Sequence, residues 1–231
     1  MPLSNEKKNV STQTFRLDLI NSSLGGILEV GFGTFAILIA IRFLGAPDMI
    51  KAVLASGVSA GLLLVPHMQR LAVWTQLSAS RFCASLMLLC ALLLFASGYL
   101  SQVWLLAAAL FLAQVCFSQL PGFMIQVYSR NYGSKERGKR LSWNFILSAL
   151  IGMILSYVGG SYLDGQSADP GLIFRIMGMV SLASALALFL IPSHRNPFPS
   201  PPRPLSACSK MCTHLHKILM ELPSRLLGGR E

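Results

Sequence analysis

Glu29 is a lone carboxylate in the middle of an apolar run that covers residues 24–43. A charge at the centre of a bilayer costs roughly 2.5–3.5 kcal/mol on insertion scales, so such groups usually face a bundle interior or a water-filled path. Glu29 belongs to a helical face on which polar or small residues recur at steps of four, three, four and four. These residues are Asp18, Ser22, Gly25, Glu29 and Gly33. This face predicts a pathway in which Glu29 binds a cation or a proton. Hydrogen bonding of Glu29 to a neighbouring helix is the alternative.

Gln114 and Ser118 are further candidates for the pathway, and Pro121 follows them in a second apolar run. At 1.5 Å per residue, Gln114 lies about 12 residues from one membrane boundary and Glu29 about 12 from the other. The two side chains are therefore expected near the same depth, where they can share a cavity. Hydrogen bonding between helices is the competing interpretation for Gln114.

The elements that position these residues are six apolar stretches, each long enough to cross roughly 30 Å of hydrocarbon. They cover residues 17–43, 49–65, 81–99, 103–128, 141–162 and 171–191. Short connections make consecutive helices antiparallel neighbours. Hydrophobic residues make up 53% of the chain and charged residues 12%, which favours an all-α membrane protein with six transmembrane helices over a water-soluble fold.

Small residues mark the surfaces at which these helices are expected to pack. Ser148, Gly152, Ser156 and Gly160 recur every four residues along the fifth stretch, and Gly25 and Gly33 belong to the first. Such ridges let another backbone approach closely. Helix packing is the favoured interpretation of the fifth-stretch ridge, and a moving gate is the alternative.

The basic residues predict the orientation, since Lys and Arg concentrate in short cytoplasmic loops. With the N-terminus inside, 16 of the 19 Lys and Arg residues fall on the cytoplasmic side and three on the other. Both termini are then cytoplasmic, in the cell (inner) membrane, and the net charge of +10 needs no nucleic acid to explain it. The connection between the fourth and fifth stretches is a basic loop that contains Arg130, Lys135, Arg137, Lys139 and Arg140, and it can also touch anionic lipid.

The string from Tyr132 to Ser142, followed by a glycine-spaced helix that ends at Asp164, resembles the junction of the fourth and fifth helices in major facilitator superfamily transporters. Six helices, a cytoplasmic N-terminus and a basic connection after the fourth also resemble the N-terminal half of that family. The resemblance implies alternating access, with a substrate site near the bilayer midplane between two six-helix halves. Because 231 residues correspond to one half, it also implies a homodimer or a second six-helix half as partner.

Residues 1–16 are expected to form a cytoplasmic segment, residues 17–191 the bundle, and residues 192–231 a proline-rich linker with a basic tail. An interfacial amphipathic helix is one interpretation of that tail, and a disordered or truncated end is the other. Cys208, Cys212, His214 and His216 match no standard zinc spacing. No metal or cofactor is predicted.

The sequence thus predicts a permease, or half of one, that moves a small polar or charged solute through the lipid bilayer, with a proton or cation as coupling ion. An enzyme is not expected, because no nucleophile–base pair, P-loop or glycine-rich nucleotide fingerprint is found in the sequence. Two alternatives stay open: a membrane interaction or assembly subunit that does not transport, and an inactive fragment of a longer transporter.

Overall fold

A computed structural model describes residues 2–100, 102–165 and 169–192. Side chains are described from Val10 onward, except those of Ser134 and Lys135. The chain divides into a unit of residues 1–196 and a unit of residues 197–231. The predicted linker and tail therefore lie outside the described residues, apart from Pro192.

Six helical segments are long and apolar enough to cross a membrane, as the sequence predicts. They are Val10–Arg42, Asp48–Trp74, Ala79–Ser97, Val103–Asn131, Glu136–Leu163 and Pro170–Leu190. The described residues contain no β-strand. In a bilayer, a helix satisfies its backbone hydrogen bonds internally, which makes this architecture the natural one for such apolar segments. The six apolar helices support a multi-pass membrane protein.

Two of the six segments are interrupted. The first consists of α1 (Pro2–Val30), a π-helical turn η1 (Gly31–Phe35) and α2 (Ala36–Arg42). The fourth consists of α5 (Val103–Ser118) and α6 (Leu120–Asn131), which meet at Gln119. Pro121 lies in the first turn of α6 and lacks the N–H that would continue the ladder of α5. The Gln119 side chain repairs the break in part, because its Nε2 donates to the Val115 carbonyl oxygen at 3.0 Å.

Two expected loops are largely helical, which corrects the predicted boundaries. Helix α3 (Asp48–Trp74) continues past Pro66, where the second stretch was expected to end. Helix α7 (Ser134–Leu163) begins inside the predicted basic loop, so only Tyr132 and Gly133 separate it from α6. Hydropathy marks where a helix leaves the hydrocarbon, whereas Lys, Arg and Glu are good helix formers that let the same helix extend into water.

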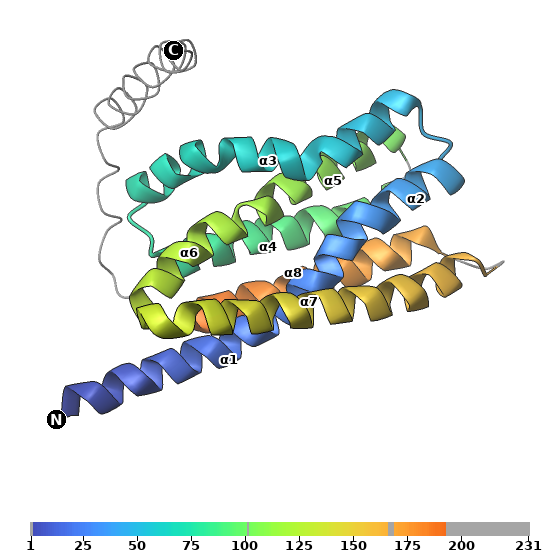
Figure 1. The fold of residues 1–231 in the computed structure, drawn as a ribbon. Coiled ribbons are helices and arrows are strands. Elements are labelled where there is room, and N and C mark those ends of the chain that lie inside the picture. Colours follow the sequence, from blue (N-terminus) through green and yellow to red (C-terminus); the bar gives the residue numbers. More distant parts are fainter. Residues whose placement is uncertain (1, 101, 166–168, 193–231) are drawn as a thin grey trace, which may run out of the picture. The chain divides into compact units, whose positions relative to one another are not determined.

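The helices pack in a bundle in which α4 (Ala79–Ser97) contacts α5 and α8 (Pro170–Leu190), while α1 contacts α7 and α8 and α3 contacts α5 (Figure 1). The core includes the fully buried side chains of Phe32, Phe123, Phe174, Met87 and Leu110. The segments of α3 and α7 are the least buried of the six. These two helices therefore present most of their apolar side chains outward, as lipid-facing helices do.

Candidate functional site

Glu29 lies in an open groove between the first segment and α7, and its side chain is exposed in this chain. The groove has a volume of about 540 Å³. It is lined on one side by Gly26, Glu29, Val30 and Thr34, and on the other by Phe145, Ser148, Ala149, Gly152, Met153 and Ser156. A carboxylate with polar neighbours Thr34, Ser148 and Ser156 is thus set into an otherwise apolar surface. This arrangement can hold a cation or a polar group of a solute.

The floor of this groove is a close contact between α1 and α7. A Cβ atom added to Gly26 would lie 2.3 Å from the Ser148 carbonyl oxygen, and one added to Gly152 would lie 3.1 Å from Val30 Cγ2. Ser148 and Gly152 are therefore placed where two backbones approach each other. By contrast, a Cβ added to Gly25, Gly33 or Gly160 would meet no described atom within 4 Å. These three predicted packing residues make no close helix contact within the described part of this chain.

The π-helical turn η1 begins at Gly31, two residues after Glu29, and was not predicted from the sequence. Turns of this type are rare, occur mostly as single turns inside α-helices and are frequent at functional sites. Gly31 begins the turn beside α8, since a Cβ added there would lie 2.4 Å from Met177 Cε. The paired glycines Gly31 and Gly33 are the signal in the sequence, although glycine alone does not distinguish a π-turn from a packing site.

Gln114 and Ser118 lie at a different place, between α5 and α3. Gln114 is 1% exposed and its amide faces Gly57, where an added Cβ would lie 1.9 Å from Gln114 Oε1. Ser118 faces Gly61 in the same way, and Gln119 Nε2 donates to the Gly61 carbonyl oxygen at 2.7 Å. Neither amide atom of Gln114 has a hydrogen-bond partner among the described residues. The groove around Glu29 is not lined by Gln114, so the expected shared cavity is not found within the described chain.

The first and fourth segments do meet near these residues, through aromatic rings. Phe32 of η1 and Phe117 of α5 have ring centroids 5.7 Å apart. Ser22, the remaining predicted pathway residue, is half-buried on α1 between Asp18 and Glu29. The pathway candidates of α1 therefore share one helix face, whereas those of α5 face α3.

Asp18 forms a buried cluster that the sequence does not reveal, which we call the Asp18 cluster: Asp18, Tyr128, Tyr132 and Asn144. Asp18 is fully buried. Its Oδ1 accepts a hydrogen bond from the Tyr128 hydroxyl at 2.8 Å, and its Oδ2 accepts one from Asn144 Nδ2. The Tyr132 ring stacks on that of Tyr128 with centroids 5.5 Å apart. Burial, with the charge of Asp18 as a smaller cause, raises the pKa of Tyr132, so its hydroxyl keeps its proton.

Further hydrogen bonds join α6 and α7 to the first segment on the N-terminal side of Asp18. Asn131 Nδ2 donates to Thr14 Oγ1 at 3.0 Å, and Arg140 Nη1 donates to the carbonyl and hydroxyl oxygens of Ser11, each at 2.9 Å. The Arg140 guanidinium also lies over the Tyr132 ring, 4.7 Å from its centroid. The start of the first segment is thereby tied to the α6–α7 connection.

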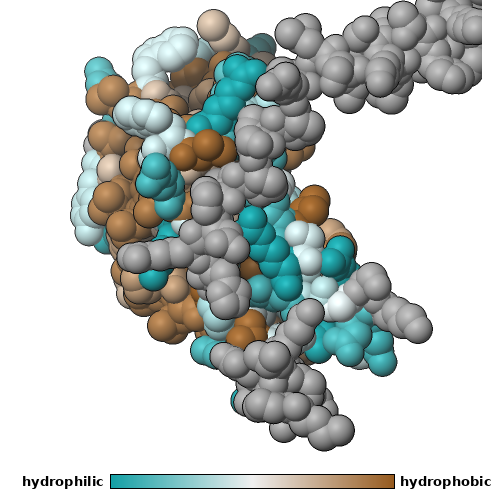
Figure 2. Space-filling view, turned by 90° about the vertical axis from the view of Figure 1, so that its left-hand side faces the viewer, coloured by the Kyte–Doolittle hydropathy of each residue, from teal (hydrophilic) through white to brown (hydrophobic). Residues whose placement is uncertain are grey.

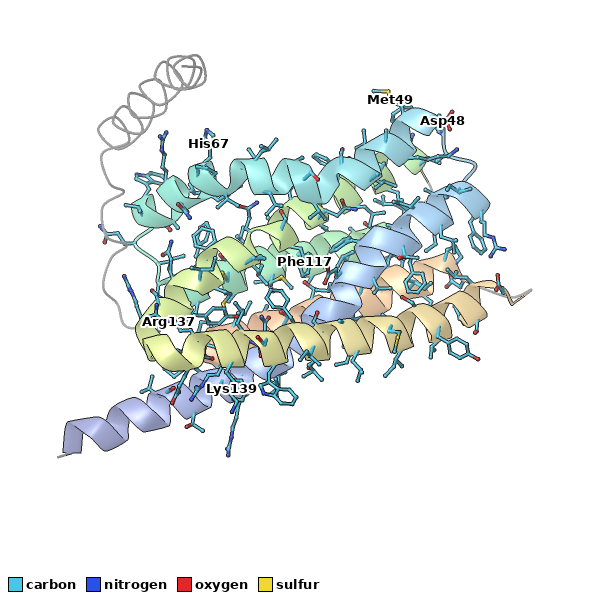
Figure 3. The ribbon with its side chains drawn as sticks, viewed as in Figure 1. Asp48, Met49, His67, Phe117, Arg137 and Lys139 are labelled. Carbon is cyan, nitrogen blue, oxygen red and sulfur yellow. The ribbon has the colours of Figure 1, made fainter. Side chains whose placement is uncertain are left out.

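The predicted basic residues gather at this end of the bundle. Arg130 and Lys139 are exposed, and Arg137 donates to the carbonyl oxygens of Ser129 and Tyr132 at 2.6 and 3.2 Å (Figure 3). The side chain of Lys135 lies outside the described residues. Figure 2 shows hydrophilic residues gathered between hydrophobic ones on this end. No group of three or more His, Cys, Asp or Glu residues that could hold a metal occurs in the described part.

At the opposite end, each of the three basic residues is paired with a carboxylate. Arg42 contacts Asp164 at 2.7 Å, Lys51 contacts Asp48 at 2.9 Å, and Arg175 pairs with Asp169. All three pairs are at least partly exposed. Pairing leaves little net charge at this end, whereas the basic residues outnumber the acidic ones at the other end.

Comparison of the sequence with protein-family models and with curated proteins found no match.

Proposed function

We propose that this chain is a half-transporter that moves a small polar or charged solute by alternating access. The observation that carries the proposal is the exposed side chain of Glu29, which with Thr34 lines the groove between the first segment and α7. A carboxylate facing lipid at this depth is costly. This cost is removed if Glu29 faces a water-filled path, either within this chain or enclosed between this chain and a partner.

The π-helical turn beside Glu29 supports the same function, because such turns allow a helix to bend or shift locally. The major facilitator superfamily is the family proposed for this half-bundle, through the residues of the α6–α7 connection quoted above. The unequal charge of the two ends supports a cytoplasmic location for both termini in the inner membrane. A homodimer or a second six-helix half is the proposed partner.

Thiol accessibility tests for an aqueous path without knowledge of the solute. In a chain whose five cysteines are replaced by serine or alanine, we expect Gly25→Cys and Gly33→Cys to react with a membrane-impermeant cationic thiol reagent. Leu88→Cys is the matched control, since Leu88 is 47% exposed on α4 and should face lipid. The proposal fails if both glycine variants are as unreactive as the control.

A non-transporting assembly subunit is the second candidate. The observation that favours it is the broad apolar surface of α7, on which Phe145, Met153 and Tyr157 are each more than 60% exposed. Such a subunit would use this surface to bind another membrane protein, and its Gly25→Cys and Gly33→Cys variants need not react with an aqueous reagent.

A further inference from the structure

Asp18 is a buried carboxylate whose described partners carry no positive charge. Tyr128 and Asn144 donate to its two oxygens, and no ion pair to Asp18 occurs in the described part of the chain. An ionised carboxylate removed from water without a paired cation is strongly destabilised. The negative charge of Asp18 must therefore be neutralised in another way.

Two neighbouring polar atoms in the cluster lack partners. The Tyr132 hydroxyl and Asn144 Oδ1 make no hydrogen bond to any described residue, although each residue is only 4% exposed. Asn144 Oδ1 can only accept, and an ionised carboxylate can only accept as well. A protonated carboxyl group supplies one O–H donor, which either of the two orphan oxygens can accept. The cluster thus holds acceptors for a proton on Asp18, and a protonated Asp18 needs no paired cation.

The other titratable groups around Asp18 do not replace this proton. From α6 and the α6–α7 connection, Tyr128 and Tyr132 present neutral hydroxyls. From α7, Arg140 binds Ser11 and Glu136 and lies over the Tyr132 ring. Helix α8 contributes one titratable residue, Arg175, which pairs with Asp169 at the opposite end.

We propose that Asp18 is a proton-binding site that controls the contact of the first segment with α6 and α7 at the basic end of the bundle. In the closed arrangement, the carboxylate has taken up a proton from water and become a neutral carboxylic acid. Release of that proton to water leaves a charge that is stable only when water reaches Asp18. Two contacts, Thr14–Asn131 and Ser11–Arg140, lie between the Asp18 cluster and the basic end of the bundle. They separate when the proton leaves Asp18. This site is distinct from Glu29 and does not depend on transport.

Infrared spectroscopy of the full chain in nanodiscs tests the protonation directly. We expect the carbonyl stretch of a protonated carboxyl group at neutral pH, and its loss as the pH is raised. Asp18→Asn should remove this band, whereas Glu29→Gln should retain it as the matched control. Tyr132→Phe keeps the ring and deletes only the orphan hydroxyl, so this variant should fold and change the pH at which the band is lost.

Distances between spin labels test the coupled movement. Labels at Gln13→Cys on α1 and Ser142→Cys on α7, both exposed sites, should move apart as the pH rises in the wild type and stay fixed in Asp18→Asn. The proposal is overturned if the wild type shows no band that Asp18→Asn or Tyr132→Phe alters. It is equally overturned if the label distance does not depend on pH, or if sodium ions rather than protons change the spectrum.

Discussion

The two carboxylates of the first segment occupy opposite environments on the same helix face. Asp18 is fully buried against α6 and α7, whereas Glu29 is exposed in a groove, 11 positions further along the chain. A buried carboxylate must be satisfied within the fold, while an exposed one in a membrane segment must be satisfied by water, solute or a partner. This difference separates the gating role that we propose for Asp18 from the binding role that we propose for Glu29.

Replacing Glu29 by glutamine is expected to abolish solute uptake or its dependence on pH or cations, while insertion and expression stay unchanged. The amide keeps the shape of the side chain but removes the charge, and a neutral group is cheaper at this depth. The loss of uptake is measured with membrane vesicles that are offered a panel of labelled sugars, amino acids and organic anions. Normal uptake across the pH range would make Glu29 a packing residue, and loss of the protein from the membrane would make it structural.

At the scale of helices, two adjacent glycines of α1 have opposite surroundings. Gly26 faces the Ser148 backbone at a distance that admits no Cβ atom, while Gly25 faces open space. The α1–α7 contact, and with it the floor of the groove around Glu29, therefore depends on one glycine of the pair.

Gly26→Ala should destabilise the protein by about 1–3 kcal/mol, the usual cost of overpacking. The added methyl group would meet a backbone carbonyl, which cannot move as a side chain can. Unfolding in mixed detergent micelles measures the change. Gly25→Ala is the neighbouring control and is expected to leave stability unchanged or slightly raised, because alanine has the higher helix propensity. Equal stability of both variants would contradict the close contact.

At the scale of the whole molecule, the charges define two unlike ends. Basic residues gather where the α6–α7 connection lies, and the three basic residues of the other end are paired with Asp48, Asp164 and Asp169. The sequence count of 16 basic residues against three therefore corresponds to a basic end and an end whose charges are paired.

Reporter fusions are expected to place both chain ends in the cytoplasm. A fusion after Ile191 should give a cytoplasmic signal, and one between residues 45 and 48 should give a signal from the opposite side of the membrane. The physical reason is the retention of basic loops on the cytoplasmic side. A fusion after Ile191 that reports from outside would overturn the six-span orientation.

A partner is expected to cover the face that carries Glu29, since exposed polar groups are costly in lipid. In native membranes, a cysteine-free chain carrying Thr34→Cys should form a cross-linked dimer or a cross-link to a second half. Leu186→Cys, at a position 60% exposed on α8, should not. Recovery of monomer alone, together with reaction of Glu29 with lipid-phase carbodiimide, would exclude this interface.

The sequence by itself determined the six helices, because hydropathy over about 20 residues is a local property. It also placed Ser148 and Gly152 on a ridge of small residues, which lies at the α1–α7 contact. Its boundaries at Val65 and Leu141 were wrong, since a helix can continue beyond the hydrocarbon that hydropathy detects: α3 extends to Trp74 and α7 begins at Ser134.

Only the tertiary structure decided which polar residues meet. Asp18 bonds to Tyr128 and Asn144, which lie 110 and 126 positions away, and no periodicity in one helix specifies a partner in another. The same holds for Glu29 and Gln114: a similar depth is predicted from helix length, whereas the helices that they face could not be predicted. Depth in a membrane is set along each helix separately, whereas the direction that a side chain faces depends on how all the helices pack.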